Sequence, residues 1–364
     1  MSRSESAQAR RRRSTGCSRT RTEKCCPVEK DLKKKMRQIV LRRPGELEER
    51  SVSLPAAGPQ EVLMRIDRVG VCGSDFHAFA GAQPAYTYPR VMGHEISGRV
   101  VEIPENERGI RVGDICAIEP YINCGHCRTC RLDRPNCCEE LKLFGVHVDG
   151  GMQGYLAVPM RLLHKSDSLT LDQLALIETL GIGANAVRRS GLAKGETALV
   201  VGAGPIGLAV TQFAVAAGAT VRVVEQSALR REFVRQFGVE ALERPDGELA
   251  DVVFDATGSA KAMAESLWQV AAGGRLVFVG LCRDAIAIDD PVFHKREVTL
   301  YASRNSCHQF PRIIGMIERG EIDTAPWINF RMPLRDVPKG FAELRKRPDL
   351  IKAMIEVEDS DAMA

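Results

Sequence analysis

The stretch Thr197-Ala-Leu-Val-Val-Gly-Ala-Gly-Pro-Ile-Gly207 decides the fold of this 364-residue chain. Its first five residues form a short apolar strand, and the glycine-rich turn that follows leads into a helix-like segment, 208–217. A second apolar strand is predicted at Thr220–Val224. A Gly-x-Gly-x-x-Gly pattern is weak by itself, but inside a strand–helix–strand unit it is typical of a dinucleotide-binding turn.

The glycines of this turn have separate tasks. Gly202 allows the tight turn, Gly204 allows the backbone to approach a pyrophosphate, and Gly207 allows the helix to pack closely on the sheet. Pro205 and Ile206 complete the turn, and the amide groups and positive end of the helix that it opens would bind the phosphates. The alternative is a parallel-sheet domain that binds no cofactor.

Glu225 follows the second strand, eighteen residues after Gly207. Its carboxylate is placed to accept hydrogen bonds from the adenosine ribose diol and would repel a 2′-phosphate, which favours NAD over NADP. Arg230 and Arg231 lie nearby and weaken this preference, because a cation accommodates the 2′-phosphate. We expect Arg230 to contact the cofactor in either case.

Strand and helix patterns continue to alternate after this unit, at Asp251–Ala256, Ala260–Val270, Arg275–Val279, Val298–Ala302 and Pro311–Glu318. Such alternation predicts a doubly wound parallel sheet, which we assign to residues 185–324. Residues 36–184 instead show short strands between Gly, Pro and Asn turns, followed by a predicted helix at Leu171–Ser190. Residues 325–364 return to short strands, and we expect them to complete this first, mostly-β domain.

The stretch Val69–Glu95 contains the residue types of a metal site and of proton transfer. Cys72, His94 and Glu95 are ligands that zinc accepts, and Ser74 and His77 follow the cysteine closely. A Lewis acid beside a short chain of proton carriers is what the oxidation of an alcohol requires. A buried structural thiol and an unrelated histidine are the alternative, because free cysteine is among the most buried residue types.

Glu178 lies in an otherwise apolar helical stretch, Leu176-Ile-Glu-Thr-Leu180. An unpaired buried carboxylate is costly. The side chain therefore either reaches solvent or binds the same metal as Cys72 and His94, and we favour the metal.

Four cysteines with short spacing form a second candidate metal site: Cys124, Cys127, Cys130 and Cys138. Four thiolates close a tetrahedral zinc site with no open position, so this site would be structural. An iron–sulfur cluster fits less well, because the ferredoxin pattern has a shorter last gap and a Cys-Pro pair. A zinc finger for nucleic acid is also possible by spacing, but this loop lies inside a larger domain.

Composition limits the remaining possibilities. A hydrophobic content of 44% and a charged content of 27% match a soluble globular protein, and no apolar run approaches the roughly 20 residues of a membrane span. Twelve cysteines with this clustering indicate metal ligands in a reducing compartment, which favours the cytoplasm. Residues 1–35 hold twelve Lys/Arg against four Asp/Glu, so the remainder has a net charge of −4 and gives no reason to expect a nucleic-acid partner. We interpret this polar extension as unfolded and favour Met36 as the native first residue. An Arg-rich arm that binds nucleic acid or acts as a targeting peptide is the alternative, although it lacks an amphipathic face.

Taken together, these motifs resemble the zinc-containing medium-chain dehydrogenase/reductase family, over residues 36–357. The matching patterns are Cys-Gly-Ser-Asp-x-His at 72–77, Gly-His-Glu at 93–95, the four-cysteine lobe and Gly-Ala-Gly-Pro-Ile-Gly at 202–207. The resemblance implies a GroES-like catalytic domain and a Rossmann domain for NAD, in a homodimer or homotetramer. It also implies two zinc ions per subunit, one structural and one catalytic, the latter held by Cys72, His94 and Glu178, with Glu95 a ligand or just behind it.

Within this family the chain is similar to the polyol and sugar-acid branch, through Gln83-Pro, Tyr88-Pro-Arg-Val, Gly145-Val-His-x-Asp-Gly-Gly151, Phe293-His-Lys and Ser303-Arg-Asn305. The resemblance implies oxidation of a secondary alcohol of a sugar acid or polyol to a ketone. Oxidation of L-threonine is an alternative, and a catalytically silent zinc-binding regulator is an alternative of another class.

A sugar acid carries a carboxylate, which needs a cationic partner. Arg304, at the end of the last predicted strand, is our first candidate and Lys295 the second, because the carboxyl ends of parallel strands face the ligand crevice. A contact of Arg304 with the cofactor phosphates is the alternative.

Overall fold

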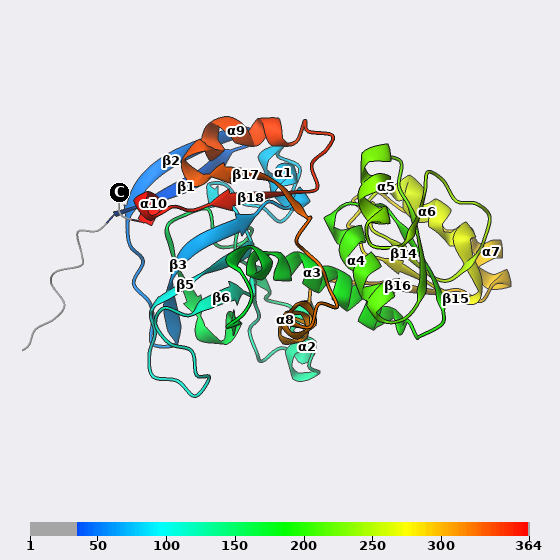
Figure 1. Cartoon of the computed structure of the whole chain (residues 1–364), viewed down its shortest axis with the longest axis horizontal. Coiled ribbons are helices and arrows are strands. Elements are labelled where there is room, and N and C mark those ends of the chain that lie inside the picture. Colours follow the sequence, from blue (N-terminus) through cyan, green and yellow to red (C-terminus); the bar gives the residue numbers. More distant parts are fainter. Residues whose placement is uncertain (1–34, 363–364) are drawn as a thin grey trace, which may run out of the picture. The chain divides into compact units, whose positions relative to one another are not determined.

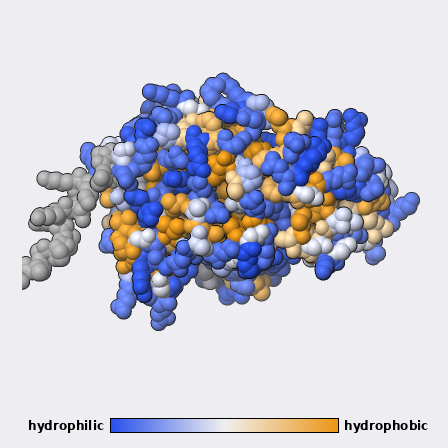
Figure 2. Space-filling view, viewed as in Figure 1, coloured by the Kyte–Doolittle hydropathy of each residue, from blue (hydrophilic) through white to orange (hydrophobic). Residues whose placement is uncertain are grey.

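The computed structural model describes residues 35–362, and the expectations about the N-terminal extension up to residue 34 lie outside this range. No helix among the described residues is long and apolar enough to span a membrane. The face drawn in Figure 2 mixes hydrophilic and hydrophobic residues.

The first sheet is built around β3 (Glu61–Gly70), which has partners from both ends of the chain. Its antiparallel neighbours are β5 (Glu95–Glu102), β9 (Tyr155–Pro159) and β18 (Lys352–Glu356). The order β10-β6-β5-β3-β18-β17 then adds β10 (Leu163–Lys165), β6 (Ile115–Ile118) and β17 (Ile328–Pro333). The C-terminal strand β18 therefore lies beside β3, with β17 on its other side, as Figure 1 shows.

Short elements surround this sheet. A separate sheet contains β1 (Lys35–Arg43), β2 (Glu46–Ser53) and β4 (Arg90–Val91), and a third contains β7 (Tyr121–Ile122) and β8 (Lys142–Leu143). The helical segments are α1 (Gly73–Phe79), α2 (Arg128–Arg131), α9 (Val337–Leu344) and α10 (Asp359–Ala362). The sequence predicted none of these short helices, because four to eight residues show little periodicity.

The second sheet is parallel throughout, as predicted. Its order is β13-β12-β11-β14-β15-β16, with β13 (Glu240–Leu242), β12 (Thr220–Val224), β11 (Thr197–Val201), β14 (Ala250–Asp255), β15 (Val270–Phe278) and β16 (Thr299–Ala302). The helices between the strands are α4 (Pro205–Ala216), α5 (Ala228–Arg235), α6 (Ala260–Ser266) and α7 (Asp290–Lys295) (Figure 1). Central residues such as Val200 and Val253 are fully buried, because helices cover the sheet.

Several predicted boundaries move in the structure. The helix predicted from residue 208 begins at Pro205, since proline suits the first helical turn. The helix predicted to reach Val270 ends at Ser266, and β15 begins at Val270. The predicted helix Leu171–Ser190 is confirmed as α3. It starts after the capping residue Thr170 and ends before Gly191, which has a φ of 65°.

The expected domain division after residue 184 falls inside α3. This helix packs on β3 and β5 of the first sheet and also on α4 and α8 (Phe310–Glu318). One buried hydrophobic cluster correspondingly includes Leu176 of α3, Val200 of β11 and Phe310 of α8. We therefore propose that α3 is a shared element, and that the domain division lies beyond its end at Gly191.

Candidate active site and metal centres

Cys72 is fixed by the start of α1. The Cys72 amide donates to Asp75 Oδ2 at 2.9 Å, and the Asp75 amide donates back to the Cys72 carbonyl at 3.1 Å. Asp75 is buried, and burial raises the pKa of its carboxyl. This reciprocal cap holds the thiol at the helix entry, and Ser74 and His77 follow on the helix itself.

His94, just before β5, and Glu95, its first residue, reach the same place. Gly93 precedes them with a φ of 94°, a conformation that favours glycine. Both side chains are buried, and one donor atom each of Cys72, His94 and Glu95 lies within 4.8 Å of the others. The structure thus brings together the three ligand types that the sequence placed in one site.

Glu178 approaches from α3 and is buried, so the alternative that it reaches solvent is wrong. The Tyr121 hydroxyl donates a hydrogen bond to Glu178 Oε1. Burial raises the pKa of Glu178, although the charge of His94 opposes this. Glu178 is not part of the 4.8 Å group of Cys72, His94 and Glu95, but its second carboxylate oxygen remains available.

These residues fit a zinc ion. His94 Nδ1 is buried, lies 3.8 Å from Asp75 Oδ1 and has no hydrogen-bond partner among the described residues. Burial opposes the charging of His94, but Cys72 and Asp75 outweigh it and raise the pKa of His94. A thiol, an imidazole and carboxylates crowded in a buried place need a cation, and this mixed set suits zinc.

Lys352 belongs to this site, and our sequence analysis missed it. Its Nζ lies 2.6 and 2.7 Å from the two carboxylate oxygens of Glu95 and 3.1 Å from Thr179 Oγ1. Burial opposes the charge of Lys352, but Glu95, Cys72 and Glu178 together outweigh it and raise the pKa of the lysine. A lysine in the apolar strand Lys352-Ala-Met-Ile-Glu356 was the available signal, but its partner is visible only once β18 pairs with β3.

A cleft of about 570 Å³ joins the metal-ligand group to the glycine-rich turn. Cys72, Ser74, His77 and Glu95 line one part of it, and Gly204, Pro205 and Ile206 line another. Ser74 is half-buried and His77 is exposed. Both proposed proton carriers therefore share one cavity with the metal ligands and with the predicted cofactor turn.

The glycine-rich turn has the geometry that its sequence predicts. Gly202 has a φ of 94°, and a side chain at Gly207 would collide with the Gly202 carbonyl oxygen. Glu225 accepts hydrogen bonds from the amides of Ala203 and Ser227, each at 2.8 Å. Glu225 also lines a neighbouring cavity of about 380 Å³, together with Gly202.

Arg230 lies beside the same turn. Its Nη1 would be 4.0 Å from a Cβ atom placed on Gly204, so the guanidinium is close to the position expected for the pyrophosphate.

Neither cation chosen for the substrate reaches the cleft. Arg304 Nε donates to the Asn136 carbonyl at 3.1 Å, while Asn136 Nδ2 donates to the Arg304 carbonyl at 2.8 Å. Lys295 is exposed at the end of α7, and neither residue lines the cleft. The segment after β16 runs against the cysteine lobe instead, so Arg304 is held outside the cleft.

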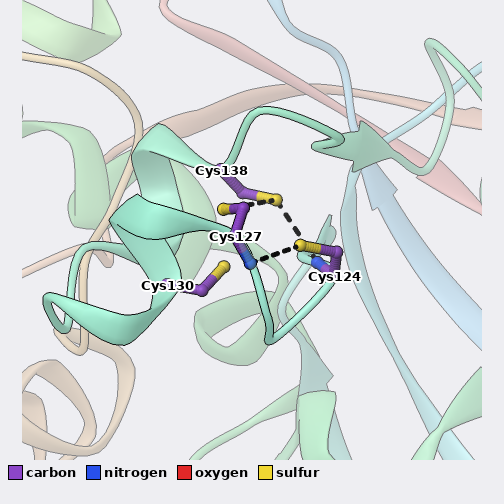
Figure 3. A group of neighbouring side chains, drawn as sticks. All are labelled: Cys124, Cys127, Cys130 and Cys138. Atoms are coloured by element: carbon purple, nitrogen blue, oxygen red, sulfur yellow. Dashed lines mark hydrogen bonds between the residues drawn. The ribbon is translucent and has the colours of Figure 1, made fainter.

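The four-cysteine lobe forms a compact group in which Cys124, Cys127, Cys130 and Cys138 turn their sulfur atoms toward one another (Figure 3). The sulfur atoms lie within 4.8 Å of one another, and Cys137 is exposed outside the group. A side-chain hydrogen bond with Thr129 lowers the pKa of the Cys127 thiol, which favours the thiolate that a metal binds. Four thiols in this arrangement fit a closed structural zinc site.

Comparisons with known proteins agree with this geometry. The model of the alcohol dehydrogenase GroES-like domain matches residues 58–168, and that of the zinc-binding dehydrogenase domain matches residues 205–319. The chain is 37% identical over 335 residues to L-galactonate-5-dehydrogenase of Escherichia coli (strain K12), covering 88% of this chain and 98% of the relative. It is 36% identical over 318 residues to 2-dehydro-3-deoxy-L-galactonate 5-dehydrogenase of Pseudoalteromonas atlantica, covering 83% and 92%.

Among solved structures, the alcohol dehydrogenase rspB of Escherichia coli CFT073, complexed with NADH, superposes with a TM-score of 0.84 at 26% identity, covering 89% of this chain and 99% of the other. The predicted pairing of a GroES-like domain with a Rossmann domain is confirmed. The chain thus belongs to the zinc-binding alcohol dehydrogenase family, as an oxidoreductase that uses zinc and a nicotinamide dinucleotide.

Proposed function

We propose that this enzyme oxidises a secondary alcohol of a sugar acid to a ketone, as an L-galactonate or L-gulonate 5-dehydrogenase does. The observation that carries the proposal is the shared cleft, in which Cys72, Glu95, Ser74 and His77 face the turn at Gly204. The names of the two relatives with the highest identity reported above, both acting on galactonate-type acids, support the substrate class.

In this proposal Cys72, His94 and Glu178 hold the catalytic zinc, and Glu95 stands just behind it. The pairing of both Glu95 oxygens with Lys352 supports this division of roles, because it already balances the charge of Glu95. When bound, zinc supplies a Lewis acid that lowers the pKa of the substrate hydroxyl. Cys124, Cys127, Cys130 and Cys138 hold a second, structural zinc.

Ser74 accepts the proton that the substrate hydroxyl loses. With the cofactor bound, Ser74 would pass this proton by way of the cofactor ribose towards His77, which is exposed at the cleft, and so to solvent. When bound, the nicotinamide would supply the hydride acceptor, and the residues that line the cleft would align it with the substrate.

We propose NAD as the cofactor. The amides of Ala203 and Ser227 hold the Glu225 carboxylate beside the turn, where it would accept from a ribose diol and repel a 2′-phosphate. Arg230 lies near Gly204 and is assigned to the pyrophosphate instead.

We also propose a cytoplasmic homodimer or homotetramer. The described cysteines are free thiols, and the edge strand β16 exposes Leu300. Light scattering on the purified protein measures its mass directly, and a monomer would contradict the proposed assembly.

The proposed function is tested by NAD and NADP reduction with aldonates, polyols and L-threonine, and by zinc analysis of the same preparation. We expect turnover with an aldonate and NAD, and two zinc ions per subunit. Turnover with no more than one zinc, confined to the cysteine lobe, would contradict the metal assignment. Turnover with L-threonine alone would replace the substrate class.

A further inference from the structure

The cleft itself contains a cation that is free to bind an anionic substrate. Two cationic side chains line it, Lys352 and Arg283. Lys352 is buried, and its ammonium is taken up by both oxygens of Glu95 and by Thr179 Oγ1. Arg283 is exposed and has no hydrogen bond or ion pair with any residue in the described range 35–362.

The position of Arg283 follows from the parallel sheet. The segments that follow β11, β14 and β15 all line the cleft, through Gly204–Ile206, Ala256–Gly258 and Gly280–Asp284. The segment after the edge strand β16, which carries Arg304, does not. The rule that ligands bind beyond the carboxyl ends of parallel strands therefore applies to β15 rather than to β16.

The other charged groups of the cleft do not neutralise Arg283. Glu95 is paired with Lys352. Asp284 also lines the cleft, but it makes no ion pair with Arg283. His77 is exposed and is assigned to proton transfer. The guanidinium therefore keeps its planar set of donors, which matches a carboxylate with two parallel hydrogen bonds.

We propose that Arg283 binds the carboxylate of the substrate and so selects sugar acids over neutral polyols. This inference rests on the proposed function, since it names the residue by which that same cleft recognises its substrate class. Gln83 lines the cleft as well and offers an amide to the hydroxyl groups between the two ends of the substrate. One end of the substrate thus lies at the metal ligands and the other at Arg283.

The test compares L-galactonate with galactitol, in which a hydroxymethyl group replaces the carboxylate, at saturating NAD. In the wild-type enzyme we expect kcat/KM to favour L-galactonate. Arg283→Met should raise the KM for L-galactonate about tenfold to a hundredfold, because it removes a charge-assisted hydrogen-bonded pair. Its KM for NAD and its kcat/KM for galactitol should stay within about twofold of the wild-type values.

Two further variants separate charge from structure. Arg283→Lys keeps the positive charge but loses the planar set of donors, and it should retain part of the preference for L-galactonate that Arg283→Met loses. Lys295→Met removes an exposed cation outside the cleft and should change neither the KM for L-galactonate nor the KM for NAD. Higher ionic strength should raise the KM for L-galactonate in the wild type more than in Arg283→Met.

The outcomes are distinguishable. An unchanged KM for L-galactonate in Arg283→Met, with turnover intact, overturns the role of Arg283 and leaves the proposed function standing. A rise in the KM for NAD equal to that for L-galactonate assigns Arg283 to the cofactor and also overturns it. If the wild type reduces NAD with neither compound, the proposed substrate class fails, and the inference fails with it.

Discussion

The cysteine lobe and the cleft site both gather residues that could bind a metal, but they take them from different distances along the chain. The lobe uses four identical side chains from the single stretch Cys124–Cys138. The cleft site takes Cys72 from the entry of α1, Glu95 from β5 and Glu178 from α3, with Lys352 arriving on β18. Four like ligands from one short stretch fill every coordination position of a zinc ion. Ligands of different types from distant segments, with further buried charges beside them, can leave one coordination position open for a substrate.

Removing Cys72 should separate the two sites most clearly. We expect Cys72→Ala to lower kcat/KM about a thousandfold or more, because the metal contributes several kcal/mol to catalysis. One zinc per subunit should be lost while the lobe keeps its own, as metal analysis would show. Full activity with a single remaining zinc would mean that the cleft holds no catalytic metal.

The charge balance of the cleft is tested by Lys352→Met. Removing one partner of a buried ion pair leaves Glu95 uncompensated beside the other buried acids, so unfolding free energy should fall by about 3–5 kcal/mol. Lys346→Met is a matched control, because Lys346 pairs with Glu343 at 2.6 Å on the surface; it should cost about 0.5 kcal/mol. Equal effects in chemical denaturation would show that Lys352 and Glu95 are not a buried ionic pair.

The lobe should respond in stability more than in chemistry. We expect Cys130→Ala to release the structural zinc and to lower unfolding free energy by about 2–3 kcal/mol. The surviving folded enzyme, assayed well below its melting temperature, should keep its KM for substrate. Calorimetry and zinc analysis measure the two effects, and Cys137→Ala, which alters the exposed neighbour, serves as the control.

The smallest expected effect concerns the ion pairs at the start of α3, the helix that carries Glu178. Asp172, in the first turn of α3, accepts from Arg68 of β3 at 3.0 Å and from Arg331 of β17 at 2.6 Å. Partial burial opposes ionisation, but the two arginines outweigh it and lower the pKa of Asp172 below its ordinary value of 3.8. A lowered folded-state pKa stabilises the protein above the unfolded value, and this contribution disappears as the pH falls through the folded value.

Asp172→Asn should therefore cost about 1 kcal/mol near pH 6, and the difference from the wild type should disappear as the pH falls through the lowered pKa of Asp172. Denaturation curves at several pH values test this. A constant difference at all pH values would mean that Asp172 acts through packing rather than charge.

Much of the fold was predictable because its patterns are local. The strand at Thr197–Val201, the turn that follows it and the helix α3 are fixed by apolar periodicity and by capping residues such as Thr170. The helices α1, α5, α7 and α9 were missed, because each is short and α1 is started by the Asp75 cap rather than by an apolar stripe. The parallel sheet was predicted, but residue types alone could not show which of its strands end at the cleft.

By itself, the sequence determined the dinucleotide turn, the cysteine lobe and the grouping of a cysteine, a histidine and a glutamate, because these residues are close along the chain or belong to one recognisable motif. Only the tertiary structure decided that Lys352 pairs with Glu95, that Glu178 is buried under Tyr121, and that Arg283 rather than Arg304 lines the cleft. These contacts depend on the pairing of β18 with β3, on the packing of α3 and on the order of the parallel strands. Each joins residues distant in sequence, so local spacing carries no information about them.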